Sequence, residues 1–416
     1  MPVAATTRAP DATQTPDGWR LVRLGEVSAI RREQVKPRKG DSRPFVGLEN
    51  MRSGGALNGH STADESISNK TVFLEGDTLY GKLRPNLRKV VRADFDGVCS
   101  TDILAIHASE RLTGSYLNHL VRSDILYKHA MRGVAGTRMP RTSWTHLRSF
   151  NLLLPPLAEQ RAIAAALDSI DEAIKRADEV IAATERLRNA LLHGLLARGL
   201  PGQHSEWKEV PGLGTIPASW KAVRLGKVCD VPRYGAGAPA RPFDPTLPRY
   251  VRITDITDDG RLRRTDARSA DPERVEGYAL QAGDLLFARS GSVGRSYLYR
   301  PEDGPCVYAG YLIRFRARSN VAVPRFLSLW TRGQFYRRWV ASMLRAGAQP
   351  NINATEYSSL PVALPPLSEQ RAIVEVLDNV DASIERAREE RDVLSTTARS
   401  VADALLTGRV RIPRRA

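Results

Sequence analysis

Residues 76–82 have the glycine and lysine spacing of a loop that binds the phosphates of a nucleotide. In such a loop the lysine is followed by a serine or threonine whose hydroxyl binds magnesium. Leu83 stands at that position here and offers no ligand. We therefore predict no ATP site. If the chain is instead an enzyme, which is the alternative from another class of protein, its nucleotide site near Lys82 is degenerate.

Other patterns for catalysis are missing from the sequence. Both Pro-Pro pairs stand in Leu-Pro-Pro-Leu, so the Asx-Pro-Pro-aromatic motif of adenine methyltransferases is absent. The sequence has no HExxH or GxSxG motif, and its seven histidines show no metal-ligand spacing. Cys99, Cys229 and Cys306 lie far apart without a CxxC pair, which predicts neither a zinc site nor a disulfide framework. We expect no catalytic residue, metal or cofactor on this chain.

The side chains that remain for chemistry are basic and amide groups in loops near glycines. Lysine and arginine number 62 against 46 acidic residues, a formal net charge of +16. Such an excess favours a polyanion as partner, because it releases counterions from phosphates, although charge for solubility alone is the other explanation. Arginine suits guanine edges and phosphates, and Asn or Gln pairs with adenine. If that polyanion is DNA, the candidate binding residues are Lys82, Arg84, Asn86 and Arg88; Thr137, Arg138 and Arg141; Arg289, Ser290, Ser292 and Arg295; and Gln349, Asn351 and Asn353.

The loops that contain these candidates are expected to have different roles. The Gly-Asp pairs at 76–77 and 283–284 look like a shared structural turn that leads into a core strand. The loops of Arg138 and Gln349 occupy equivalent places before a repeated Leu-Pro-Pro-Leu block, yet their chemistry differs. Side chains that contact different bases should differ in chemistry in this way.

Short elements must position the loops. Runs of strand length and composition are separated by Gly, Asp and Pro, and two longer stretches have helical spacing. Each half is therefore predicted to be a mixed α/β unit of about 140 residues. The strand runs include 71–74, 103–106, 250–253 and 311–315, and the helical stretches are 114–129 and 324–344.

The order of the elements repeats along the chain. LPPLAEQRAI at 154–163 returns as LPPLSEQRAI at 364–373, and the Trp19–Val27 segment is echoed by Trp220–Val228. The shared order of these matches predicts a tandem duplication.

A long helix is predicted after each repeated block. Apolar residues recur at alternating steps of four and three from Ile163 and from Ile373, over more than four heptads. A helix of about 40 residues, or about 60 Å, needs a partner along such a stripe, so we expect the two helices to pair within the chain. Arg188 and Arg391 interrupt the stripe. The favoured explanation is a packed stem with its head in water, and a register-setting or DNA-facing role is the alternative.

With these motifs the chain resembles the specificity subunit of a type I restriction-modification system. The resemblance covers Trp19 almost to the C-terminus and is carried by the repeated block with its helix and by the segments 81–86, 212–220 and 283–292. It implies two α/β target-recognition domains, each reading one half of an asymmetric bipartite DNA sequence. The two helices would form an antiparallel coiled coil with a pseudo-twofold axis and set the spacer between the halves.

The resemblance also implies partners. Two methyltransferase subunits that use S-adenosylmethionine, and two restriction subunits that use ATP and Mg, would supply the chemistry, and no cofactor is expected on this chain. A system whose methylation and cleavage activities share one polypeptide is an alternative, as is a scaffold or repressor without sequence choice. The alternative is that Leu157, Leu367, Ile163 and Ile373 only pack the helix base against its own domain. Both roles can hold together, and Gln160 and Gln370 are expected to be the more exposed candidates for docking. The docking candidates are Leu157, Glu159, Gln160, Leu367, Glu369 and Gln370.

The first 18 residues look like a flexible arm, and no apolar run is long enough to span a membrane, so we expect a cytoplasmic protein. The predicted layout is an arm at 1–18, a recognition domain at 19–157, a helix at 158–198, a linker at 199–219, a second recognition domain at 220–367, a second helix at 368–407 and a basic tail at 408–416.

Overall fold

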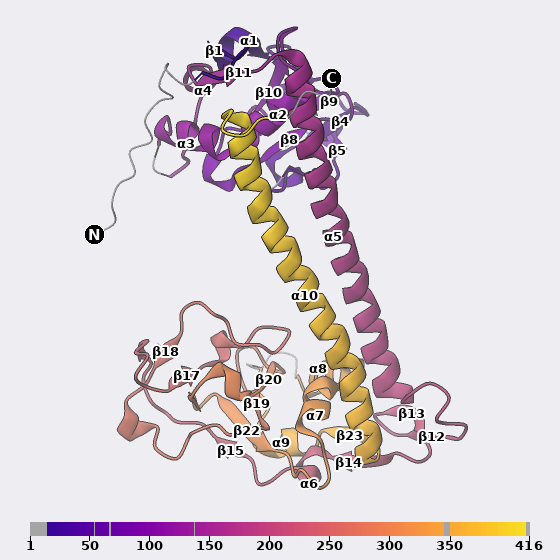
Figure 1. Ribbon diagram of the computed structural model, residues 1–416. Helices are drawn as coiled ribbons and strands as arrows, with labels where there is room; N and C mark the ends of the chain where they lie inside the picture. The colour runs from indigo at the N-terminus through magenta and orange to yellow at the C-terminus, as the bar shows by residue number, and fades with distance from the viewer. Residues whose placement is uncertain (1–14, 54, 66–67, 137, 345–349, 413–416) are drawn as a thin grey trace. The chain divides into compact units, whose positions relative to one another are not determined.

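The computed structural model describes residues 15–53, 55–65, 68–136, 138–344 and 350–412. These residues form two compact units (Figure 1). Unit 1 comprises the described residues up to Glu179 together with those from Arg388 onward, and unit 2 comprises Val180–Ala387. Each unit therefore takes part of each long helix that the sequence predicts.

Unit 1 is built on two small sheets. The strand β7 is buried along its whole length, and it bonds to β10 on one side and to β8 on the other. The first sheet has the order β2 (Ser28–Ile30), β10 (Ile103–Ala108), β7 (Thr78–Gly81), β8 (Val90–Arg92). The second has the order β3 (Gln34–Val35), β6 (Lys70–Phe73), β9 (Gly97–Cys99), β4 (Pro44–Val46), β5 (Ser61–Thr62), with β4 and β9 parallel.

Unit 2 repeats this plan. Phe287 on its central strand packs with Phe315 and Tyr357 in an aromatic core. Its main sheet has the order β15 (Arg233–Tyr234), β22 (Leu312–Arg316), β19 (Asp284–Ala288), β20 (Ser296–Leu298). A parallel pair, β17 (Arg249–Val251) with β21 (Cys306–Tyr308), corresponds to β4 and β9, and β16 (Arg241–Pro242) pairs with β18 (Arg268–Ser269).

The predicted strands are confirmed as β6, β10, β17 and β22, with ends shifted by one or two residues. One of these shifts matters for the site. Tyr311, predicted as the first residue of a strand, lies in the turn before β22.

Each predicted short helix is in fact two helices. In unit 1, Ser123 separates α2 (Gly114–Arg122) from α3 (Asp124–Arg132), because its Oγ donates to Leu120 O at 2.6 Å and accepts from Leu126 N at 3.3 Å. In unit 2, residues 331–333 separate α7 (Pro324–Trp330) from α8 (Gln334–Met343). A hydroxyl that bonds to the backbone ends one helix and caps the next. The remaining short helices are α1 (Leu24–Val27), α4 (Trp144–Leu147), α6 (Leu225–Val228) and α9 (Ala354–Ser358).

A strand pair closes each domain by joining its first residues to those before the Pro-Pro. Val22 pairs with Leu152, and Val223 pairs with Val362. The predicted linker also contains a hairpin, and its Leu213 joins the core of unit 2. The strands are β1 (Arg20–Arg23) with β11 (Asn151–Leu154), β14 (Lys221–Arg224) with β23 (Pro361–Leu364), and β12 (Trp207–Val210) with β13 (Gly214–Pro217).

The two long helices are α5 (Leu157–Arg198) and α10 (Leu367–Leu406), coloured magenta and yellow in Figure 1. In unit 1, Ile163 near the start of α5 shares a core with Leu405 near the end of α10. In unit 2, Leu195 near the end of α5 shares a core with Ile373 near the start of α10. The helices are therefore antiparallel. The predicted stripe positions, in steps of four and three from Ile163 to Leu195 and from Ile373 to Leu405, are all buried or half-buried, which confirms the heptad pattern.

The expectation that Arg188 has its head in water is wrong. Its Nε lies 2.5 Å from Asp381 Oδ1 and its Nη2 lies 3.2 Å from Oδ2, so a bidentate ion pair joins α5 to α10. Arg391 makes a looser pair with Asp178, at 3.3 Å. An arginine in an apolar stripe needs a carboxylate there, because burial leaves its charge without water.

Burial disfavours the charged form of Asp381, but the hydrogen bond and charge of Arg188, together with the charge of Arg325, outweigh it and lower the pKa of Asp381. A lowered carboxyl pKa adds stability above the unfolded value, and this stability is lost as the pH falls through the folded value. Replacing Arg188 should therefore cost more at neutral than at acidic pH.

We predict that Arg188→Met lowers the free energy of unfolding by about 1–3 kcal/mol at pH 7, because Asp381 loses its bidentate partner. The difference from wild type should shrink as the pH falls below about 4. Urea unfolding between pH 3 and 7 measures both. Arg186→Met, at an exposed site on the same helix, is the control. An equal effect of the two substitutions would contradict the ion-pair assignment.

Candidate DNA interface

A short backbone frame in unit 1 holds two of the loops that the sequence singled out. Lys82 N donates to Asp102 O at 2.9 Å, and Thr142 N donates to Lys82 O at 3.1 Å. Leu83 forms a β-bridge with Arg141. The loop that starts at Lys82 and the loop that ends at Arg141 therefore lie side by side.

Unit 2 contains the same frame. Arg289 N donates to Tyr311 O at 3.0 Å, Ile352 N donates to Arg289 O at 2.8 Å, and Ser290 forms a β-bridge with Asn351. Each of these contacts has its counterpart in unit 1. In the described residues, the segment at Lys82 thus corresponds to that at Arg289, and the segment at Arg141 corresponds to that at Asn351.

The side chains on the two frames are unlike. In unit 1, Arg141 Nε donates to Asp102 Oδ1 at 3.1 Å and Nη2 approaches Oδ2 at 3.4 Å. In unit 2, Arg289 Nε donates to Asn351 Oδ1 at 3.3 Å, and its guanidinium lies 5.0 Å from the ring centre of Tyr234. A constant backbone that presents variable polar side chains is typical of a recognition site.

The loop after Lys82 turns sharply and presents polar groups. Arg84 and Arg88 both have φ of 50°, a left-handed conformation that costs a side-chain-bearing residue about 1–2 kcal/mol. The loop is held by Arg84 N, which donates to Pro140 O at 2.7 Å. Arg84, Asn86 and Arg138 are exposed, and within the described ranges their side chains have no hydrogen-bond or ionic partner. They are available to a ligand.

Three other predicted DNA contacts have structural partners instead. Arg88 bonds to Asp124 and stacks on Tyr127 at 4.4 Å from the ring centre. Arg295 Nε donates to Asp258 at 2.7 Å. Asn353 caps α9, because its Oδ1 accepts from Glu356 N at 2.9 Å. These contacts fix the shape of the loops, and the role of the three side chains as DNA contacts stays a prediction.

The remaining predicted residues divide into two groups. Lys82, Ser290 and Ser292 are half-buried within the loops. Thr137 and Gln349 lie outside the described residues.

The Gly-Asp pairs at 76–77 and 283–284 form structural turns, which is the explanation that the sequence favours. Asp77 is buried, takes a bidentate pair with Arg31 at 2.9 and 3.1 Å, and accepts from Leu74 N. Asp284 does the same with Arg316, at 2.7 and 2.9 Å. In addition, residues 78–81 form a bonded strand, so their amides are not available to phosphate. A nucleotide site near Lys82 is thereby disfavoured.

Gln160 and Gln370 are not exposed, contrary to expectation. Each side chain is 0% exposed. Gln160 Oε1 accepts from Thr113 N at 2.9 Å, and its Nε2 donates to Arg111 O and Pro155 O, both at 2.9 Å. Gln370 makes the same three bonds in unit 2, to Val323 N, Val321 O and Pro365 O.

The neighbouring glutamates are buried too. Glu159 accepts from Trp19 Nε1 at 3.1 Å and pairs with Arg411 at 2.8 Å. Glu369 accepts from Trp220 Nε1 at 2.9 Å and bonds to His204 at 2.7 Å. Both glutamates and both glutamines therefore anchor the helix base to its own domain. Of the predicted docking residues, Leu157 is exposed and Leu367 is half-buried.

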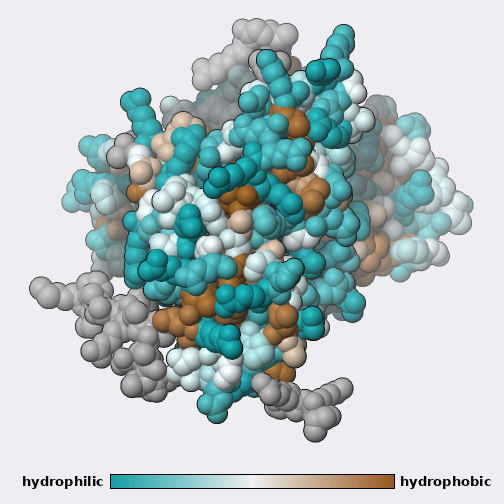
Figure 2. Space-filling view, turned by 90° about the horizontal axis from the view of Figure 1, so that it is seen from above, coloured by the Kyte–Doolittle hydropathy of each residue, from teal (hydrophilic) through white to brown (hydrophobic). Residues whose placement is uncertain are grey.

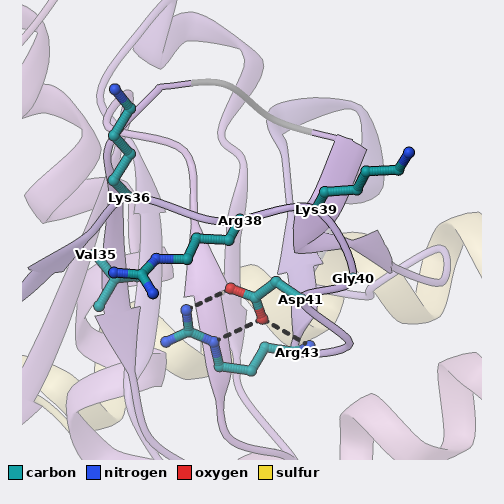
Figure 3. Close-up of a pocket in the computed structure, with 7 residues that line it drawn as sticks. All are labelled: Val35, Lys36, Arg38, Lys39, Gly40, Asp41 and Arg43. Atoms are coloured by element: carbon teal, nitrogen blue, oxygen red, sulfur yellow. Dashed lines mark hydrogen bonds and ion pairs between the residues drawn. The ribbon is translucent and has the colours of Figure 1, made fainter.

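The sequence interpretation overlooked a basic hollow in unit 1 (Figure 3). Asp41 faces Arg43, whose Nε donates to it at 2.9 Å, and the pairing lowers the pKa of Asp41. The amino groups of Lys36 and Lys39 point away from this pair. Lys36, Arg38 and Lys39 are exposed and, as far as the structure describes the chain, have no acidic partner. Three cations around Pro37 are the signal that the sequence already contained. The hollow, of about 460 Å³, is lined by Val35, Lys36, Arg38, Lys39, Gly40, Asp41 and Arg43.

Other kinds of site find little support. Burial raises the pKa of Cys99, Cys229 and Cys306 to about 12 in each case, and all three thiols are free. The described residues contain no group of three or more His, Cys, Asp or Glu that could hold a metal ion. No helix in the described part of the chain has the apolar length needed to cross a bilayer. The face shown in Figure 2 is mainly hydrophilic, with hydrophobic residues in separate areas.

Together these features define a class of protein. It is a tandem duplication of two α/β units on one antiparallel helix pair, in which each unit carries a loop site with its own side chains.

The family model for the type I restriction modification DNA specificity domain matches residues 16–182 and again residues 217–394. The chain belongs to this family of type I restriction-modification specificity subunits. It is 22% identical over 412 residues to the type I restriction enzyme MjaVIII specificity subunit of Methanocaldococcus jannaschii, covering 96% of this chain and 94% of the relative. It is also 22% identical to the EcoKI specificity subunit of Escherichia coli, over 89% of this chain and 84% of that one.

Solved structures support the fold. A chain from work on complex assembly and conformational transition of the type I R-M system has a TM-score of 0.59 at 24% identity, covering 95% of this chain and 100% of that chain. The type I restriction-modification S subunit from M. genitalium has a TM-score of 0.55 at 13% identity, covering 96% and 97%.

We predict that Gln370→Leu lowers the free energy of unfolding by about 3 kcal/mol, because it leaves one amide and two carbonyls buried without partners. Urea unfolding followed by circular dichroism measures this. The control is Arg371→Leu, which makes the same replacement at the adjacent exposed position and should change stability by at most about 0.5 kcal/mol. If Gln370→Leu is equally mild, the anchoring role is wrong.

Proposed function

We propose that this chain selects the DNA sequence on which a type I restriction-modification complex acts. Unit 1 reads one half of an asymmetric bipartite target and unit 2 reads the other. The observation that carries the proposal is the shared backbone frame with unlike side chains, Lys82, Asp102 and Arg141 against Arg289, Tyr311 and Asn351. Equal frames suit the same duplex geometry, and unlike side chains suit different bases.

Exposed groups around the frame of unit 1 complete the interface. Arg84, Asn86 and Arg138 have no partner among the described residues and can meet base edges or phosphates. The hollow at Lys36, with its three exposed cations, suits the phosphate backbone, because lysine and arginine gain affinity by neutralising phosphates.

The paired helices have two tasks in this proposal. Their length sets the number of unread base pairs between the two half-sequences, as dimer geometry sets half-site spacing in other DNA-binding proteins. Their exposed surfaces, beginning at Leu157, receive two methyltransferase subunits, because the duplication supplies two equivalent helix starts. Two restriction subunits complete the complex in the cytoplasm.

The chemistry lies on the partners. S-adenosylmethionine, ATP and Mg are bound by the methyltransferase and restriction subunits, and this chain contributes only sequence choice. This division agrees with the burial of the segment near Lys82, where strand pairing occupies the amides.

The test is to co-express the chain with its methyltransferase partner in a host that lacks adenine methylation and to map methylated adenines genome-wide. We expect one split motif with two unlike halves, and no methylation without the chain. Methylation without a split motif, or methyl transfer by the isolated chain, would overturn the proposal.

We predict that replacing both Arg84 and Arg138 by alanine changes or relaxes the first half of the motif and leaves the second half intact. Arg289→Ala should do the reverse. Each lost base contact should reduce discrimination by about tenfold, since such contacts are worth about 1–3 kcal/mol. Arg92→Ala, which removes an exposed charge from β8, is the control and should leave the motif unchanged. The assignment of units to half-sequences is wrong if both halves change together.

We predict that replacing Lys36, Arg38 and Lys39 by glutamine weakens binding of the complex to cognate and unrelated duplexes by the same factor. The slope of log affinity against log salt should fall in magnitude by about 2–3, because each neutralised phosphate contributes about 0.9. Fluorescence anisotropy over a salt series measures it. A matched variant with glutamine at Arg20, Arg23 and Arg92 should leave the slope unchanged, and equal slopes for all three proteins would contradict the phosphate role.

A further inference from the structure

The backbone frame at Lys82 in unit 1 and at Arg289 in unit 2 includes one more residue in each unit. Its backbone carbonyl accepts from the backbone N–H of Lys82 or of Arg289. It is Asp102 in unit 1 and Tyr311 in unit 2, each the last turn residue before β10 or β22. Their strands also start in the same register, since Ile103 pairs with Gly81 and Leu312 pairs with Ala288. The two residues are thus structural equivalents of opposite chemistry.

We infer that this position determines DNA specificity: Tyr311 contacts a base edge directly with its ring, and Asp102 positions Arg141 for the same purpose. The inference rests on the proposed function, which assigns the frames to base reading. It adds a residue in each unit that basic or amide composition does not reveal.

Tyr311 is one of the most exposed large side chains in unit 2. It is 65% exposed, and within the described residues its hydroxyl has no hydrogen-bond partner. A single exposed aromatic is ordinary on a protein surface. Here, however, its backbone carbonyl is bonded to Arg289, one of the two polar residues on the frame. The backbone of this aromatic is therefore fixed at the place where a duplex would be read.

The residues around Tyr311 indicate which feature of a DNA base its ring would contact. Arg289 and Asn351 supply hydrogen-bonding groups on the same frame, and Arg289 is braced by the ring of Tyr234. Tyr234 is itself held, because its hydroxyl accepts from Ala354 N at 3.0 Å. An uncharged ring beside polar readers suits the apolar feature of the major groove, the C5-methyl group of thymine. We assign Tyr311 to a thymine in the second half-sequence.

Asp102 acts through Arg141. The carboxylate of Asp102 accepts hydrogen bonds from Nε and Nη2 of Arg141. The two hydrogens on Nη1 and the second hydrogen on Nη2 then point away from Asp102. That end of the guanidinium can donate to O6 and N7 of guanine. Asp102 is therefore a positioning residue, and it fixes an arginine side chain that is otherwise 41% exposed.

The experiment uses the full complex with its methyltransferase partner and the genome-wide map of methylated adenines. Tyr311→Ala should lose discrimination at one base pair of the second half-sequence by about tenfold. Tyr311→Phe should keep it, because the ring remains. Phe243→Ala, which removes another exposed aromatic of unit 2, is the matched control and should leave the motif unchanged.

A second measurement tests the methyl contact. Wild-type complex should methylate a duplex with deoxyuridine in place of that thymine about tenfold more slowly, and Tyr311→Ala should not distinguish the two duplexes. If the wild type shows a split motif and Tyr311→Ala retains it, the inference fails while the proposed function stands. If the wild type shows no split motif, the proposed function itself fails.

Asp102→Asn tests the positioning role. It keeps the size of the side chain but removes the charge that holds Arg141, so the preference at one base pair of the first half-sequence should relax. A purely structural role would lower methylation at all sites without changing the motif, and that outcome would overturn the assignment of Asp102.

Discussion

The first turn of each long helix contains a glutamine whose side-chain amide is buried and hydrogen-bonded at both its oxygen and its nitrogen, and the attachment of the helix to its unit depends on this contact. Gln160 joins the first turn of α5 to Thr113, Arg111 and Pro155, which belong to the recognition domain. A buried amide without those partners would be costly, so the helix can leave its domain in only one direction. The adjacent glutamate adds a second tie, to the tryptophan that opens the domain. The first turn of the helix is thereby fixed to its own domain.

This constraint explains why the repeat is strong in some places and weak in others. The anchor at Gln370 reproduces that at Gln160 bond for bond, and both stand in the block that the sequence repeats almost unchanged. The loop frames also agree in their backbone bonds, but their side chains do not. Backbone bonds do not depend on side-chain identity, so the geometry of reading can stay fixed while the content changes.

Much of the architecture was predictable from local patterns. The duplication, the heptad stripe and most strands follow from short-range spacing, which the fold preserves. The contacts that the sequence did not predict join residues distant in the chain: Arg88 bonds to Asp124, 36 residues away, and Arg188 bonds to Asp381, 193 residues away. Gln160 looked exposed because helix patterning does not show the loop that covers it. Tyr311 was concealed because an aromatic beside an apolar run is indistinguishable from the start of a strand.

The two units differ in how their chain is assembled during synthesis. Unit 2 is one continuous stretch, whereas unit 1 needs residues from Arg388 onward. Leu405 and Leu406 complete the core around Ile163 and Leu167. On a ribosome, the recognition domain of unit 1 emerges before that of unit 2 but is finished after it, because the apolar face of α5 in unit 1 stays uncovered until Leu405 and Leu406 have been made. A polypeptide released before Leu405 would lack this closing segment. The core of unit 1, although most of it is made first, would then be incomplete.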